Sequence, residues 1–325
     1  MPMKAIAYTE HGPPDVLALT DVPIPVPKDN QVLIRVRALA LNPLDWHLMR
    51  GEPAFIKMMA GKAGGIPGVD VAGVVERVGA RVTQFRPGDE VFGSAWRACA
   101  EYVCTAENKL VPKPARLTYE QAAAIPVAGC TALQALRDRG RLQPGQSILI
   151  NGAAGGVGTF AVQIARALGG EVTGTCSSRN LEFVRSLGAH HVIDYTQNDF
   201  ATMEQKYDLI VQVAGNRTST ELRRALTPRG TAVEVGGGTG REEVDIPISD
   251  ILESVARTMF ARFQRQKVLL MMAKSRNSDL RFLADLIESG KVTPVVDRTY
   301  PLAEAADAIR YLEAGHARGK VIVTI

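Results

Sequence analysis

The chain has few aromatic residues and almost no excess of charge, and each shortage excludes a class of protein. Aromatic residues make up 6% of the 325 residues, and the formal net charge is +4. No basic cluster is interleaved with aromatic side chains, so we expect no nucleic-acid partner. No apolar run approaches the ~20 residues that a membrane-spanning helix needs. Because the amino terminus runs straight into a strand pattern, we also expect no signal peptide, no membrane partner and a cytoplasmic protein.

Cysteine is also scarce, with four residues in the whole sequence. Cys99, Cys104, Cys130 and Cys176 form no C-x-x-C pair and no metal-type spacing. We expect free thiols in a reducing compartment. The length itself is typical of two domains.

The most informative stretch is a β-branched run at 148–151 that ends in a glycine cluster and is followed by an apolar pattern of helical period. This order predicts a strand, a tight turn and a helix whose first N–H groups face a pyrophosphate. Ala153, Gly155 and Gly158 stand at the three glycine positions of the G-x-G-x-x-G fingerprint. An ordinary turn is the alternative interpretation. The candidate cofactor-binding residues are Gly152, Ala153, Ala154, Gly155, Gly156 and Val157.

The choice of dinucleotide is read at the end of the next strand, predicted at 171–175. A protein that prefers NAD usually has Asp or Glu there, which binds the ribose 2′-hydroxyl. The sequence instead reads Ser177, Ser178 and Arg179, and two hydroxyls with a guanidinium suit a 2′-phosphate. The alternative is that Ser177 caps the next helix. We predict NADPH as the cofactor.

The texture of the sequence changes along the chain. The first third is rich in short strands and broken by prolines, which favours an irregular β-barrel. From about residue 118, strands and helices alternate, which indicates a doubly wound parallel sheet. The last residues again read as strands, so we expect the tail to return to the first domain. We place strands at 147–151, 171–175, 191–194, 207–213, 230–235 and 267–272, and helices near 157–169, 179–188, 198–204, 217–227 and 278–289.

Several motifs in this order resemble one known family. They are Asn42-Pro43-Leu44-Asp45-Trp46, Pro67 to Val75, Pro87 to Val91, the Ala153–Gly158 turn and Gly315 to Lys320. Over nearly its full length the chain resembles the medium-chain dehydrogenase/reductase superfamily, in its zinc-free, quinone oxidoreductase-like branch that includes zeta-crystallin. The resemblance implies an α/β fold, with a GroES-like β-barrel domain at 1–120 and 278–325 and a Rossmann domain at 121–277. The family's active site lies in the cleft between these domains.

The zinc alcohol dehydrogenases of this superfamily carry three catalytic ligands that this chain lacks. By resemblance, Asn42, Val69 and a position near Val127 stand where those ligands would be. Asn and Val cannot provide a catalytic zinc site, so we predict no metal. Without a Lewis acid, hydride transfer favours an acceptor that is already electron-poor. The resemblance implies NADPH-dependent reduction of a quinone or an α,β-unsaturated carbonyl compound. A nonenzymatic NADPH-binding protein and a zinc alcohol dehydrogenase are the competing hypotheses.

The candidate catalytic residues are Asn42, Asp45 and Trp46. By resemblance Asn42 lies beside the nicotinamide, where its amide could donate to a substrate carbonyl or hold the ribose; a simple turn before Pro43 is the alternative. Asp45 could join this network or cap a helix that starts near Trp46. The Trp46 indole is a poor proton donor, so water or a ribose hydroxyl would supply the proton.

Further cofactor contacts are expected from the resemblance and from the fold. Tyr195 could lie against the adenosine phosphate or pack on the adenine-side rim, Thr131 could bind through its hydroxyl, and Lys320 could contact the cofactor or carry a solvated charge. Loops that follow parallel strands line such a site, and these supply Ala214, Gly236 and Gly237.

The substrate is hardly readable from the sequence. Two apolar segments, 54–59 and 258–263, contain methionine and phenylalanine and would suit a small hydrophobic acceptor or a dimer interface. A homodimer is the expected assembly, as is common among relatives.

Overall fold

The computed structural model describes residues 2–52, 64–235 and 265–325. The chain divides into two compact units. The first unit contains residues 1–130, 275–288 and 294–325, and the second contains 131–274 and 289–293. The boundary between them falls within helix α4 (Pro126–Leu133).

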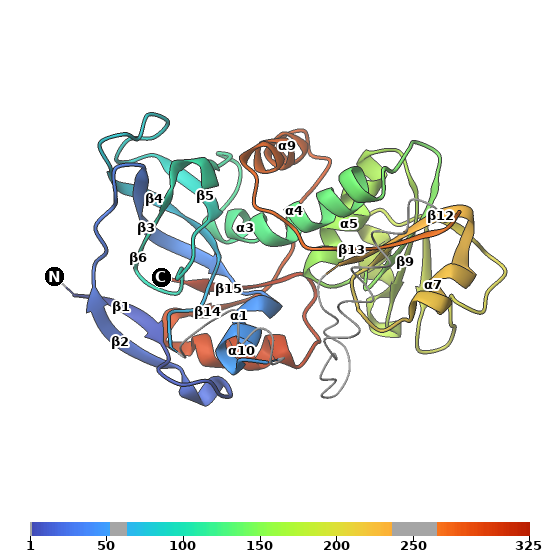
Figure 1. Cartoon of the computed structure of the whole chain (residues 1–325), viewed down its shortest axis with the longest axis horizontal. Helices are drawn as coiled ribbons and strands as arrows, with labels where there is room; N and C mark the ends of the chain where they lie inside the picture. The colour runs from blue at the N-terminus through green and yellow to red at the C-terminus, as the bar shows by residue number, and fades with distance from the viewer. Residues whose placement is uncertain (1, 53–63, 236–264) are drawn as a thin grey trace. The chain divides into compact units, whose positions relative to one another are not determined.

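The first unit is built on a mainly antiparallel sheet of seven strands (Figure 1). Its strand order is β14-β15-β3-β4-β5-β7, and β6 also pairs with β3. A separate antiparallel pair, β1–β2, is formed by the amino terminus. The bounds are β1 Pro2–Ala7, β2 Ala18–Pro23, β3 Gln31–Ala40, β4 Asp70–Val78, β5 Glu90–Ser94, β6 Tyr102–Ala106, β7 Leu110–Pro112, β14 Val296–Pro301 and β15 Lys320–Thr324.

The carboxyl-terminal tail completes this sheet, since β15 pairs antiparallel with β3. Along β3, β4 and β15, buried residues in some places alternate with exposed ones and in others follow one another directly. Buried residues of these three strands belong to one hydrophobic core. Helices pack beside it: α1 (Pro43–Arg50), α3 (Tyr119–Ala123), α9 (Asn277–Glu288) and α10 (Ala305–Glu313), with short 3₁₀ turns η1 (Pro14–Val16), η2 (Glu107–Lys109) and η6 (Leu302–Glu304).

The second unit is a parallel sheet of six strands in the order β10-β9-β8-β11-β12-β13. This is the doubly wound order of a dinucleotide-binding domain, in which ligands bind beyond the carboxyl ends of the central strands. The bounds are β8 Ser147–Asn151, β9 Glu171–Cys176, β10 His191–Asp194, β11 Tyr207–Gln212, β12 Leu226–Val235 and β13 Lys267–Met271. The π-helical turn η3 (Gln134–Arg139) precedes β8. Between the strands come α5 (Gly156–Ala167), η4 (Ser178–Asn180), α6 (Leu181–Ser186) and α7 (Ser219–Ala225).

Two sequence-based predictions of helices were wrong. No helix forms at 198–204, because the Asp199 carboxylate accepts the Ala201 N–H at 2.9 Å and holds a turn instead. The first helix, α1, begins at Pro43 rather than near Trp46, because Asn42 is its N-cap. Strands 147–151 and 191–194 were predicted at the bounds that the structure has.

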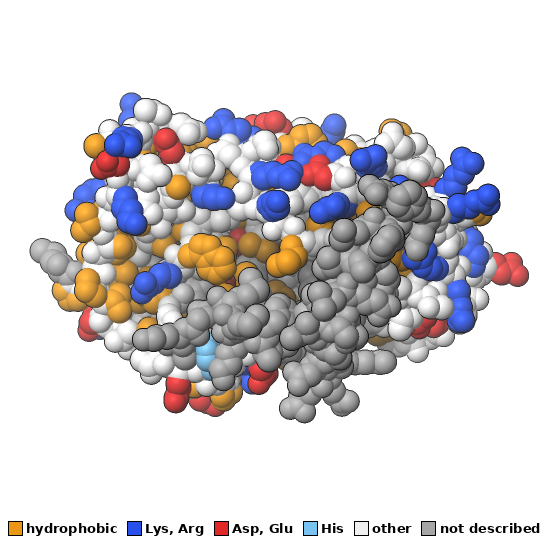
Figure 2. Space-filling model, viewed as in Figure 1, with side chains coloured by type: hydrophobic (Ala, Val, Ile, Leu, Met, Phe, Trp, Pro, Cys, Tyr) orange, Lys and Arg blue, Asp and Glu red, His pale blue; other side chains and the backbone are white. Residues whose placement is uncertain are grey.

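The surface carries charges of both signs. On the face drawn in Figure 2, Lys and Arg side chains are spread among Asp and Glu rather than gathered into one basic patch. Within the described ranges, no helix is long and apolar enough to cross a membrane.

Candidate cofactor and active site

The glycine-rich turn after β8 is shaped by two glycines and left open at a third. Gly152 has φ +93°, a conformation that L side chains rarely adopt. A Cβ at Gly158 would stand 2.0 Å from the Gly152 carbonyl oxygen, so only glycine fits where the helix approaches the strand. A Cβ at Gly155 would meet nothing nearer than that same oxygen at 3.7 Å. The protein therefore leaves space above Gly155 into which a ligand can come close.

The helix that follows this turn has an uncapped amino terminus. Its N-cap is Gly155, and among the described residues no side chain accepts a hydrogen bond from its first turn. Helices α3 and α7, in contrast, begin with Thr118 and Thr218, whose hydroxyls accept N–H groups of Gln121 and Glu221. The first N–H groups of α5 thus need an outside acceptor, and the helix dipole favours a negative one. The turn fits a pyrophosphate.

A row of polar side chains at the carboxyl edge of the sheet holds the turn in place. The Thr175 hydroxyl accepts the Gly152 N–H at 3.1 Å and donates to Asn151 Oδ1 at 2.6 Å. Asn151 Nδ2 then donates to Gln212 and, at 2.9 Å, to Asn216. Sequence reasoning missed this row, although a signal was present: Asn151 and Gln212 end β8 and β11 directly after apolar runs.

The loop after β11 is attached to the same strand end. The Ala214 N–H donates to the Asn151 carbonyl at 3.2 Å, and Ala214 is also the nearest neighbour of Gly152. The structure therefore brings Ala214 to the glycine-rich turn, and its contact with the cofactor stays a prediction. Thr131 is buried near the end of α4. Gly236, Gly237 and the segments 54–59 and 258–263 lie outside the described residues.

The segment after β9 presents polar side chains to solvent. Ser178 and Arg179 are exposed, and Tyr195 after the neighbouring strand is 54% exposed. Ser177 makes no capping hydrogen bond; its hydroxyl instead accepts from Asn180 Nδ2 at 3.3 Å. The capping interpretation of Ser177 therefore receives no support, and its side chain is available for another role.

In the first unit, a buried polar cluster gathers at the start of α1. It joins Asn42, Asp45, Asp70 and Lys320, of which none is more than 4% exposed. Lys320 comes from β15, at the far end of the sequence, and Asp70 opens β4. Sequence reasoning gave Asp70 no role, although a carboxylate inside the apolar run 66–75 was a signal for one.

The amide of Asn42 is held in one orientation. Lys320 Nζ donates to Asn42 Oδ1 at 2.6 Å and to the Leu41 carbonyl at 3.0 Å. Asn42 Nδ2 donates to Asp70 Oδ2 at 3.0 Å and to the Ala40 carbonyl at 3.3 Å. Because an ammonium can only donate and a carboxylate can only accept, these partners fix which end of the amide is the oxygen. Both amide hydrogens are thus used within the protein, and only Oδ1 retains a free lone pair.

Asp45 binds backbone rather than side chains. Its carboxylate accepts the Asn42 N–H at 2.7 Å and the Gly68 N–H at 3.0 Å, so it closes the first turn of α1 and binds it to the segment just before β4. Burial raises the pKa of Asp45 to about 7, with the charge of Asp70 acting in the same direction, while the two N–H donors oppose the rise. Trp46 is half-buried against the core of the first unit and stacks on His47 with 3.7 Å between ring centres.

Asp70 and Lys320 form a buried ion pair with 3.5 Å between Oδ2 and Nζ. Burial raises the pKa of Asp70 and lowers that of Lys320, while their mutual attraction opposes both shifts. The other oxygen of Asp70 accepts the Val127 N–H at 2.9 Å. Lys320 has three oxygens around its three ammonium hydrogens, which favours a role through Asn42 over a direct contact with the cofactor.

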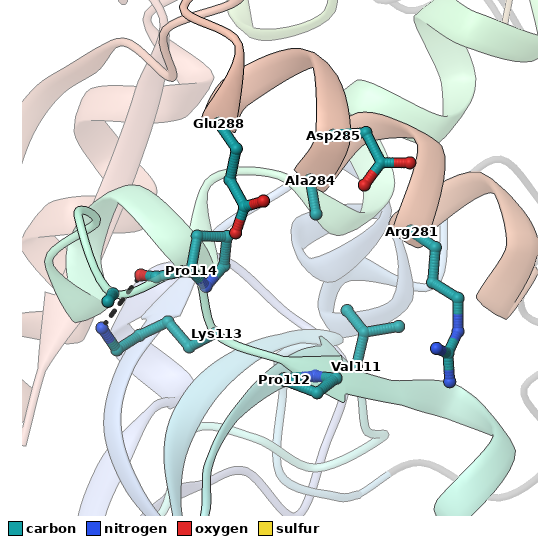
Figure 3. A pocket seen from close by; sticks show the side chains of 9 residues that line it. Val111, Pro112, Lys113, Pro114, Arg281, Ala284, Asp285 and Glu288 are labelled. Atoms are coloured by element: carbon teal, nitrogen blue, oxygen red, sulfur yellow. Dashed lines mark hydrogen bonds between the residues drawn. The ribbon is translucent and has the colours of Figure 1, made fainter.

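Among the residues that the structure describes, no three His, Cys, Asp or Glu side chains gather to hold a metal ion. The first unit also has an open pocket lined by Val111 to Ala115 and by α9 (Figure 3). Its charged side chains, Lys113, Arg281, Asp285 and Glu288, are of both signs, and the Lys113 amine already donates to the Leu117 carbonyl at 2.7 Å. No residue predicted for the cofactor or active site lines this pocket.

Comparison with known proteins identifies families that the two parts of the chain match. Residues 28–135 match the family described as "Alcohol dehydrogenase GroES-like domain", and residues 187–323 match "Zinc-binding dehydrogenase". The chain is 34% identical to the "Chloroplast envelope quinone oxidoreductase homolog" of Arabidopsis thaliana, over 99% of this chain and 98% of the relative. It is 35% identical to the "NADPH-dependent alkenal/one oxidoreductase, chloroplastic" of the same plant, over 99% of this chain and 79% of the relative.

The solved structure of the quinone oxidoreductase from Coxiella burnetii superimposes with a TM-score of 0.88 at 32% identity, covering 100% of both chains. The chain belongs to the quinone oxidoreductase-like branch of the medium-chain dehydrogenase/reductase superfamily. The barrel of its first unit is GroES-like, and its second unit is a Rossmann domain. The fold predicted from the sequence is thereby confirmed, and the chain is an oxidoreductase of this superfamily.

Proposed function

We propose that this protein is an NADPH-dependent reductase that transfers a hydride to a quinone or an α,β-unsaturated carbonyl compound. The observation that carries the proposal is the uncapped amino terminus of α5 beneath a turn left open at Gly155. Relatives similar over 99% of the chain are named as quinone and NADPH-dependent alkenal/one oxidoreductases, which supports both the cofactor and the acceptor class. When bound, the reduced nicotinamide supplies the hydride.

In the second unit, Gly152 to Val157 would hold the pyrophosphate, and Ser177, Ser178, Arg179 and Tyr195 would surround the adenosine 2′-phosphate. The exposure of Arg179 and Tyr195 supports this role. An Arg179→Ala variant should lose NADPH affinity by about 1–3 kcal/mol, through loss of a charge-assisted hydrogen bond, and keep its affinity for NADH. Equal losses for the two cofactors, measured by fluorescence titration, would count against this site.

In the first unit, Asn42 would act as a hydrogen-bond acceptor. Its two amide hydrogens are used by Asp70 and Ala40, so Oδ1 is left to accept from a ribose hydroxyl. Donation to a substrate carbonyl, the other role considered from the sequence, would require one of these bonds to break. Asp45 and Lys320 would position Asn42 rather than touch the substrate. The Trp46 indole cannot release a proton, so the proton that follows the hydride would come from water or a ribose hydroxyl.

We propose that the reaction needs no metal. The support comes from the donor atoms: Asn42 Oδ1 and Asp70 Oδ2 already face the ammonium of Lys320, which occupies the cationic position in this cluster. Activity should therefore survive dialysis against a chelator, and metal analysis of the active protein should find less than one zinc per chain. Loss of activity that added zinc restores would refute metal independence.

The decisive experiment is an acceptor screen with NADPH and NADH side by side. Quinones, enones and saturated ketones of similar size are compared by loss of the reduced cofactor's absorbance. The proposal expects turnover with quinones or enones, and none with the saturated ketones, since these lack an electrophilic β carbon. Tight NADPH binding without turnover across the whole screen would instead favour a nonenzymatic NADPH-binding protein.

Two further predictions concern the cellular location and the oligomeric state of the protein. A cytoplasmic location is supported by the four cysteines, all of which are free thiols. The named Arabidopsis relatives are chloroplastic, so fractionation of the source cells is the test. A homodimer is carried over from the resemblance alone, and light scattering of the purified protein would decide it.

A further inference from the structure

A carboxylate reaches the expected 2′-phosphate site from the neighbouring strand. Asp194 ends β10, which pairs in parallel with β9 so that Asp194 lies beside Cys176. Two residues further along, Ser178 donates from its hydroxyl to Asp194 Oδ2 at 2.5 Å. The segment 176–180 contains no acid of its own, so this negative charge is visible only once the sheet is formed.

The hydrogen bonds around Asp194 fix the direction in which Ser178 donates. Asp194 Oδ1 accepts both the N–H and the hydroxyl of Thr196, at 3.0 and 2.7 Å. These bonds, together with the one from Ser178, hold the pKa of Asp194 below its usual range, so the group is charged at neutral pH. The single proton of the Ser178 hydroxyl is committed to this carboxylate. The Ser178 oxygen also lies 3.1 Å from Thr196 Oγ1, so towards solvent Ser178 offers a lone pair and no donor.

The two cofactors make opposite demands on such a hydroxyl. The ribose 2′-hydroxyl of NADH carries a proton that Ser178 can accept. The 2′-phosphate of NADPH carries only acceptors, and it is repelled by a nearby carboxylate. Ser178 as it stands suits the first and not the second, whereas Arg179 suits the second.

We propose that Asp194 is a specificity-determining residue that holds back the preference for NADPH and lets the site also accept the unphosphorylated ribose. Cofactor choice is then a balance between Arg179, which attracts the 2′-phosphate, and the Asp194–Ser178 pair, which disfavours it. This inference rests on the proposed location of the adenosine ribose at Ser177 to Arg179. A purely structural role, holding the turn 194–197, would change stability but not cofactor choice.

An Asp194→Asn variant separates the two roles. Asn keeps an oxygen for the Thr196 N–H, and its Nδ2 can donate to Ser178, which frees the Ser178 proton for a phosphate. Binding is measured by calorimetry with two fragments that differ only in the 2′-phosphate, adenosine 2′,5′-bisphosphate and adenosine 5′-monophosphate. The ratio of their affinities should shift about tenfold towards the bisphosphate, and the kcat/KM ratio of NADPH to NADH should move in the same direction.

Thr196→Val is the matched control. It removes one hydrogen bond to the same carboxylate, together with the 3.1 Å contact between Thr196 Oγ1 and Ser178 Oγ, and leaves the carboxylate charge in place. The affinity ratio should therefore stay within about twofold of the wild type, while both variants unfold at a lower urea concentration than the wild type. An Asp194→Asn ratio that is unchanged, or shifted towards the monophosphate, would overturn the inference. If Arg179→Ala still weakens the bisphosphate in that case, the proposed cofactor site stands; if the wild type binds neither fragment, both fall.

Discussion

Replacing Lys320 by methionine tests whether its ammonium holds the buried cluster of the first unit together. Methionine has a similar length and is apolar, so the change removes the charge and leaves little cavity. The Asp70 carboxylate, which is 0% exposed, would then be buried without its cation, and Asn42 Oδ1 would lose its donor. Breaking a buried pair from one side costs about 3–5 kcal/mol, because the remaining charge is left uncompensated. We expect the free energy of unfolding of the first unit to fall by that amount.

The chain offers a convenient assay. Both of its tryptophans, Trp46 and Trp96, belong to the first unit, so tryptophan fluorescence during urea unfolding reports on that unit alone. The second variant needed is Lys320→Met with Asp70→Asn, in which both charges of the ion pair are removed together. We expect this double variant to recover about 1–2 kcal/mol relative to Lys320→Met.

The outcome that would refute the reasoning is additivity. If the free energy of unfolding lost by the double variant equals the sum of the losses in Lys320→Met and Asp70→Asn alone, the two side chains do not stabilise each other as an ion pair. Asn42 is then held by other contacts. A Lys320→Met protein within about 1 kcal/mol of the wild type would lead to the same conclusion.

Two more predictions concern Asp45 and the glycine-rich turn. Because folding raises the pKa of Asp45 from 3.8 to about 7, the stabilising contribution of Asp45 is complete below the unfolded pKa and is lost as pH rises through about 7. In urea titrations, the stability difference between wild type and Asp45→Asn should therefore shrink by roughly 2 kcal/mol from pH 5 to 7. A constant difference would show that Asp45 is ionised throughout this range. Gly155→Ala should bind NADPH at least about tenfold more weakly, with a loss of stability below about 1 kcal/mol. Gly158→Ala should also lower the stability of the second unit, by about 1–3 kcal/mol. Fluorescence titration measures the binding and calorimetry the stability, and a Gly155→Ala protein that binds NADPH normally would contradict the role of the turn.

The second unit shows how much of a fold can be predicted from neighbouring residues in the sequence. The run 148–151, the glycine spacing and the helical period after it are all properties of neighbouring residues, and they placed β8, the turn and α5 correctly. The segment 198–204 failed for an equally local reason: the Asp199 side chain competes for the backbone N–H group that a helix would need.

The site is a different matter. The absence of an acid after β9 was correct as a statement about sequence, yet Asp194 brings one to Ser178 across 16 residues. Asn42 was predicted as a site residue, but its available atom is set by Lys320, 278 residues away. No spacing rule connects such pairs, since only the pairing of β15 with β3 and of β10 with β9 brings them together.

What the sequence determined by itself is the alternation of strands and helices, the glycine-rich turn and, through its motifs, the superfamily, because periodicity, turn chemistry and motif spacing are local properties of a chain. What only the tertiary structure decided is the charge and hydrogen-bond polarity at each site. A buried amide or hydroxyl offers its donor or its acceptor according to the partners that surround it, and here those partners come from distant strands.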